Sequence, residues 1–156
     1  MKKAITLIVF LLIATAAVFG QNNDIFNMLE GLTHNFPATE DGARRILVSN
    51  GFIPAGKDRY INSFEGVSIV SRSEYGTYSA NRTEITFIFK FNDDLYFVKF
   101  IREYLTYFSN RYGVSFNGSH GNSNYYVFYN ENEATALAMD YNSNEKNVVI
   151  WVSLNN

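Results

Sequence analysis

The stretch that decides the fold is TEITFIFKFNDDLYFVKFIREYLTYFSNRYG, residues 83–113. Its first nine residues alternate between two sets of side chains. One set is fully apolar and the other largely polar: Ile85, Phe87, Phe89 and Phe91 against Glu84, Thr86, Ile88 and Lys90. Strict alternation is typical of a half-buried strand in an antiparallel sheet. We therefore expect a strand over residues 83–91 with one face in the core.

The residues that follow change to helical spacing. Asn92 or Asp93 can cap the first turn, and Gly113 is a natural stop. One apolar stripe contains Val98, Ile101, Leu105, Phe108 and Tyr112, and a second contains Phe97, Phe100, Tyr104 and Tyr107. Because two adjacent stripes leave only a narrow polar side, we expect this helix to pack on a sheet and to touch another element as well.

Two shorter helices are predicted before the strand. Residues 25–32 place Ile25, Met28, Leu29 and Leu32 at helical spacing. A better-marked helix follows Thr39, a natural N-cap, with two acids in its first turn and Asn50-Gly51 at its end.

Four further strands are expected, at residues 64–72, 124–130, 133–141 and 147–154. The order predicts an α+β two-layer sandwich, in which two or three helices pack on one face of an antiparallel sheet of about five strands. Gly51 and Gly113 lie about 60 residues apart and each closes a helix, which is compatible with a degenerate helix-plus-hairpin duplication. The expected organisation is a signal peptide at 1–20, a short helix and lead-in at 21–37, and one domain at 38–156.

The first twenty residues have the layout of a secretory signal peptide. Lys2 and Lys3 precede an uncharged apolar stretch from Ala4 to Phe19, and cleavage fits after Gly20 or Ala16. This stretch is shorter than the roughly 20 residues that cross a bilayer, so we expect removal and no membrane span afterwards. The Met-Lys-Lys start is typical of bacterial export signals. The predicted location is therefore extracytoplasmic, periplasmic or secreted.

Composition excludes several kinds of site. The chain has 156 residues, no cysteine and a net charge of −2. Disulfides, thiol catalysis and thiolate metal sites are therefore excluded. No basic run is present, so we do not expect nucleic acid as a partner.

The sequence gives little support for catalysis. The two histidines, His34 and His120, are far apart, and no Gly-x-Ser-x-Gly elbow is present. The acid pairs Glu40-Asp41 and Asp93-Asp94 both fall at helix starts, where capping explains them. We therefore expect no catalytic residue, no metal and no cofactor, with a small hydrolase as an alternative.

The segment FNGSHGNSNYY, residues 116–126, contains His120. The Asn-Gly pair favours a hairpin turn, which would place His120 in solvent at its tip. A binding loop around His120 is the alternative.

The sheet face opposite the helices is the candidate binding surface. It would carry Trp151, Ile88 and Val149, together with small side chains at Ala134, Ala136 and Ala138. Depending on register, either Tyr126 and Phe128 or Tyr125 and Tyr129 would extend it. Tryptophan and tyrosine are enriched at binding surfaces. The sequence thus favours a non-enzymatic module that binds a protein or a cell-envelope component, with a homodimer also compatible. A small carrier of an apolar ligand, held between the main helix and the sheet, is an alternative.

Overall fold

The computed structural model describes residues 24–64, 67–74, 82–130 and 135–155. The predicted signal peptide and Ala134 lie outside these residues. Within them, no helix is both long enough and apolar enough to cross a membrane.

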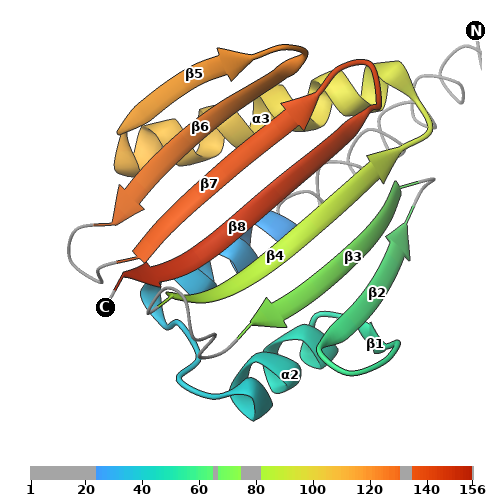
Figure 1. Ribbon diagram of the computed structural model, residues 1–156, viewed down its shortest axis with the longest axis vertical. Helices are drawn as coiled ribbons and strands as arrows, with labels where there is room; N and C mark the ends of the chain where they lie inside the picture. Colours follow the sequence, from blue (N-terminus) through green and yellow to red (C-terminus); the bar gives the residue numbers. More distant parts are fainter. Residues whose placement is uncertain (1–23, 65–66, 75–81, 131–134, 156) are drawn as a thin grey trace, which may run out of the picture.

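The described strands form one open antiparallel sheet (Figure 1). They are β1 (Ile53–Pro54), β2 (Arg59–Phe64), β3 (Val67–Glu74), β4 (Arg82–Phe91), β5 (Phe116–His120), β6 (Ser123–Asn130), β7 (Thr135–Asn142) and β8 (Asn147–Asn155). Their order in the sheet is β1-β2-β3-β4-β8-β7-β6-β5. The α+β class is confirmed, but the expected number of five strands is wrong, because the sheet has eight.

Three of these strands were not predicted from the sequence, each for a local reason. β1 is a two-residue edge strand that contains Pro54, and proline is tolerated only at such edges. In β2 the apolar residues Tyr60 and Ile61 are adjacent, so the sequence does not alternate between apolar and polar there, although Tyr60 is buried and Ile61 exposed. β5 contains the Asn-Gly pair that predicts a turn, but the turn lies farther along, where Gly121 has φ of 60°. A glycine with positive φ at the first central position suits a two-residue hairpin.

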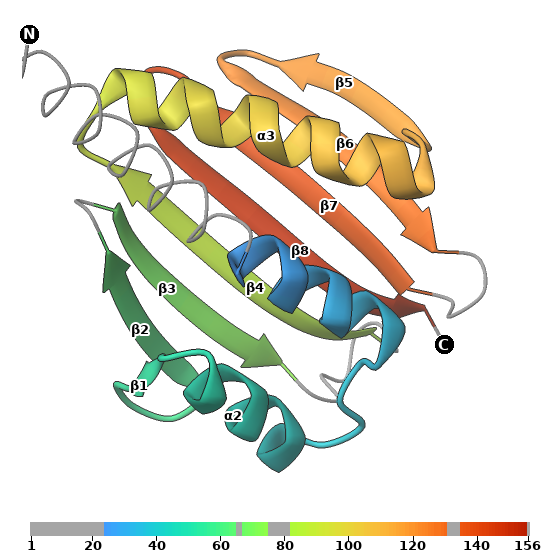
Figure 2. The same cartoon turned by 180° about the vertical axis from the view of Figure 1, so that it is seen from behind.

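Three helices pack on one face of this sheet: an N-terminal helix at residues 24–34, α2 (Glu40–Ser49) and α3 (Asp94–Tyr112). Figure 2 shows them side by side on that face, with α3 over the β4-β8-β7-β6 half and α2 beside β1–β3. The predicted caps are confirmed. Thr39 accepts a hydrogen bond from the Gly42 amide at 3.2 Å, and Asp93 accepts one from the Tyr96 amide at 2.7 Å.

The same order of elements occurs twice in the chain. α2 is followed by the four strands β1–β4, and α3 by the four strands β5–β8. The two meanders meet where β4 pairs with β8, at the centre of the sheet. Each unit therefore has four strands after its helix, rather than the expected hairpin.

The core lies between the sheet and the helices. From α3 it takes Phe97, Phe100, Ile101, Tyr104 and Phe108. Val98, which was expected in the first stripe, is 58% exposed, because the stripe that faces the sheet is centred on Phe100 and Tyr104. The second apolar contact expected for α3 is the N-terminal helix. Its Phe26 lies with ring centroids 5.3–6.1 Å from those of four α3 aromatic residues.

Polar contacts also join the N-terminal helix to α3. Glu30 binds the Arg111 guanidinium through Oε1 at 2.8 Å, and its Oε2 lies 2.6 Å from the Tyr107 hydroxyl. Arg111 in turn lies over the Tyr107 ring, 3.6 Å from its centroid. Burial and the hydrogen bond to Glu30 raise the pKa of Tyr107 to about 12. The helix at 24–34 is thus held to α3 by both apolar and polar contacts.

Candidate binding surface on the open face of the sheet

The sheet face opposite the helices, called the open face below, has no described helix over it (Figure 1). Strand register sorts its side chains into rows that run across the strands. One row is aliphatic and crosses five neighbouring strands: Ile53, Ile61, Val70, Ile88 and Val149. Ile53 is 63% exposed and Ile61 39% exposed, while the other three are half-buried. Aliphatic side chains at this exposure give the open face an apolar stripe.

The next row continues the apolar surface on the other half of the sheet. Trp151 pairs with Ala138, Ala138 with Val127, and Val127 with Phe116. Phe116 is 57% exposed, and its ring lies 5.4 Å from that of Tyr125. The two rows together make an apolar surface that reaches across all eight strands.

Three of the six predicted binding residues meet on this surface. Ile88 pairs directly with Val149, and Trp151 lies two residues farther along β8 on the same face. Tyr126 and Phe128 do not belong to it. Phe128 is buried against Tyr104 and Phe108, and Tyr126 stacks on Tyr141 on the helix side.

The register of β6 explains the correction. Met139 and Leu137 are core residues of β7, and they pair with Tyr126 and Phe128. Because directly opposed residues share a face, the alternate residues Tyr125 and Tyr129 lie on the open face. The sequence left two registers open, and the structure has the one that places Tyr125 and Tyr129 on the open face.

His120 is exposed at the end of β5, next to the hairpin turn. It pairs with Ser123, which pairs with Asn142 in a polar row at the border of the open face. Gly118, the next residue on this face of β5, lies under Tyr125: a β-carbon at position 118 would lie 2.5 Å from the Tyr125 hydroxyl oxygen. His120 therefore lies outside the two apolar rows.

Asp140 is an open-face residue that sequence reasoning did not select. It lies within β7, with Tyr125 opposite on one side and Val149 on the other. Its Oδ1 is shielded from solvent and accepts no hydrogen bond from the described residues. The sequence signal that could have indicated this open-face position is an aspartate inside a strand of alternating side chains.

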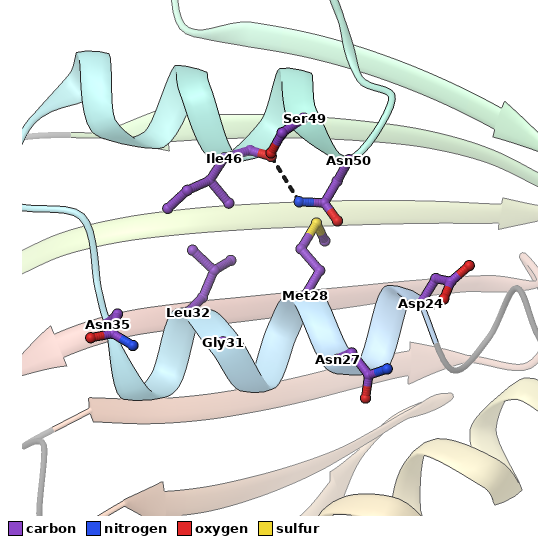
Figure 3. A pocket seen from close by; sticks show the side chains of 9 residues that line it. All are labelled: Asp24, Asn27, Met28, Gly31, Leu32, Asn35, Ile46, Ser49 and Asn50. Carbon is purple, nitrogen blue, oxygen red and sulfur yellow. Dashed lines mark hydrogen bonds between the residues drawn. The ribbon is translucent and has the colours of Figure 1, made fainter.

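A groove lies on the helix side, between the N-terminal helix and α2 (Figure 3). Its volume is about 680 Å³, and Met28, Leu32 and Ile46 point toward one another across it. Its rim is polar and includes Asn27, Asn35 and Asn50, and Asn50 donates a hydrogen bond to the Ile46 carbonyl. Met28 and Leu32 are only 8% and 1% exposed, so the groove offers little apolar surface to a ligand.

The site expected for a carried ligand, between α3 and the sheet, is filled by side chains. Phe100 lies 5.0 Å from Phe89, and Phe108 lies 6.0 Å from Phe128, measured between ring centroids. Aromatic pairs at these distances are in direct packing contact. The described part of this layer is therefore core.

The residues considered for catalysis have structural contacts. Asp93 caps α3, and Asp94 pairs with Lys146 at 2.8 Å. His34 lies 3.2 Å from the Tyr112 hydroxyl. Among the described residues, no three histidine, aspartate or glutamate side chains gather as metal ligands would.

Comparisons of the chain with family models, with curated proteins and with solved structures found no significant match. The arrangement of its own side chains is therefore the basis for a functional proposal. The open face carries two apolar rows whose residues are exposed or half-buried.

Proposed function

We propose that this protein is a non-enzymatic binding module, secreted or periplasmic, whose open face docks another protein or a cell-envelope component. The observation that carries the proposal is the pair of apolar rows that crosses the eight strands on the side away from the helices. Contiguous exposed apolar surface on a folded domain marks an interaction site.

The dimensions of the open face suit a protein partner. Eight strands at a spacing of about 4.8 Å give a width of about 34 Å, and three same-face repeats along the strands give about 20 Å. The resulting area of roughly 700 Å² is close to the roughly 800 Å² that each partner buries in a standard interface. The face can therefore support a specific complex without help from other surfaces.

The residue types also favour recognition. Trp151 and Tyr125 are large, rigid aromatic groups, and such groups supply a large share of binding energy at interface centres. The polar row with Asn142 and His120 borders the apolar rows, as a hydrophilic rim borders an apolar interface core. By comparison, the groove of Figure 3 has a polar rim, and Met28 and Leu32 at its base are nearly buried, so a carrier function is less well supported.

Site-specific photocrosslinking tests the proposal. A photoreactive amino acid replaces Ile61 on the open face or, as a matched control, Val48 on α2, where exposure is similar at 39% and 47%. In cells that make the protein, we expect an adduct of discrete mass from position 61 and none from position 48. Equal adducts at both positions, or none at either, would contradict the proposal. An adduct of twice the chain mass would identify the partner as a second copy.

A further inference from the structure

Asp140 is a carboxylate on the open face, between the apolar rows and the polar row that contains Asn142. Tyr125 and Val149 are its direct cross-strand neighbours, at the roughly 5 Å between β-carbons that such pairs have. Trp151 is a diagonal neighbour, two residues beyond Val149, within reach of a large ring. Ala138, the preceding residue on the same face of β7, is small and leaves room beside the carboxylate.

One oxygen of the Asp140 carboxylate has no hydrogen-bond partner within the described part of the chain. Oδ1 of Asp140 is shielded from solvent and accepts no hydrogen bond there. Two other acids of the fold do have partners: Glu30 binds Arg111, and Glu84 on the same open face accepts a hydrogen bond from the Thr86 hydroxyl at 3.0 Å. Lys90, an exposed cation of the open face, lies two strands away from Asp140. A shielded carboxylate oxygen without a hydrogen-bond donor costs folding free energy.

The surroundings of Asp140 suit a cationic group on an apolar stem. A carboxylate forms charge-assisted hydrogen bonds with ammonium or guanidinium donors. Tyrosine and tryptophan rings attract the same cations through their faces. Lysine and arginine carry such a head on a methylene stem that packs along apolar surface. The aliphatic row in line with Asp140 and the Trp151 row beside it would then contact the residues that flank the basic side chain.

We infer that Asp140 is the anchor of the open face for a basic side chain, and that the partner is a protein segment that presents lysine or arginine between apolar residues. This inference rests on the proposed function and specifies the chemistry of its partner. In the complex, the basic side chain supplies the donors that Asp140 lacks in the free chain. Tyr125 and Trp151 contact the stem of that side chain.

Peptide selection tests the inference. A phage library of random dodecapeptides is selected on the folded chain, and the selected peptides are then measured by fluorescence anisotropy against single variants. We expect enrichment of lysine or arginine flanked by apolar residues. Asp140→Asn, which keeps the shape of the side chain, should remove that enrichment and weaken binding by at least about tenfold. Asp140→Lys should select acidic peptides instead.

Glu84→Gln is the matched control, because Glu84 is an open-face acid that already has a donor within the chain. It should leave the selection unchanged, and circular dichroism should show every variant folded. Peptides that need Trp151 but show no preference for basic residues would overturn the inference and leave the proposed function standing. Peptides that bind Trp151→Ala as tightly as the natural chain would argue against the open face itself. A selection that yields no binder would overturn docking of a basic segment.

Discussion

Phe26→Ala should lower the free energy of unfolding by about 3–5 kcal/mol. Phe26 is 2% exposed and packs against four aromatic rings of α3, so truncation removes the aromatic contact between the N-terminal helix and α3. Urea denaturation followed by circular dichroism measures the change. Hydrogen exchange should show the largest loss of protection in residues 24–34.

Phe116→Ala is the control for this result, since it makes the same chemical change at a side chain that is 57% exposed. Its effect on unfolding should be small. If the alanine variant does not fold, the milder change Phe26→Leu still allows the loss in the free energy of unfolding to be measured. A loss below about 1 kcal/mol for Phe26→Ala would mean that the N-terminal helix is not part of the cooperative core.

Tyr104→Phe should raise the free energy of unfolding by roughly 1–3 kcal/mol. Tyr104 is fully buried among aromatic rings, and its hydroxyl has no hydrogen-bond partner among the described residues. Because the buried hydroxyl loses its hydration without gaining a bond, removing it recovers that cost. Thermal unfolding should show a melting temperature higher by several degrees.

The stability of the chain at alkaline pH provides a second readout. Burial raises the pKa of Tyr104 well above its ordinary value of 10.0. The unfolded chain therefore releases this proton first, and stability falls as the pH rises above about 10. Tyr104→Phe should reduce that fall. A lower melting temperature for Tyr104→Phe would instead show that the Tyr104 hydroxyl is satisfied.

Tyr107→Phe should lower stability at neutral pH, because the Tyr107 hydroxyl is bound to Glu30.

The helices and the central strand could be predicted because local signals and tertiary structure agree. Thr39 and Asp93 cap their helices, and β4 alternates strictly between core and open face. β5 was missed because its Asn-Gly pair favours a turn in isolation, whereas the Tyr125 ring packs over Gly118 within a strand pair. That contact depends on a residue of the neighbouring strand, so the local pattern could not indicate it.

The residues of the open face were predicted in part for a similar reason. Ile88 lies on β4, where strict alternation of apolar and polar residues indicates its face. Val149 and Trp151 lie on β8, whose residues 148–152 are all apolar, so only the pairing with β4 decides that they lie on the open face. The β6 segment from Tyr125 to Tyr129 is apolar or aromatic at every position, so its sequence does not indicate which of these side chains face the core. Pairing with Met139 and Leu137 decides which of its side chains enter the core. The position of Asp140 opposite Tyr125 depends on the same pairing.

Acrylamide quenching of Trp151 fluorescence, with and without a selected peptide, tests the role of the open face most directly. The chain has one tryptophan, so the signal has one source. In the free chain we expect clear quenching that does not change with protein concentration, and a marked decrease in quenching when the peptide is bound. Weak quenching in the free chain at every concentration would mean that Trp151 is already covered, and weak quenching only at high concentration would mean that a second copy covers it. Unchanged quenching with the peptide bound would place the binding site elsewhere, and would contradict docking on the open face.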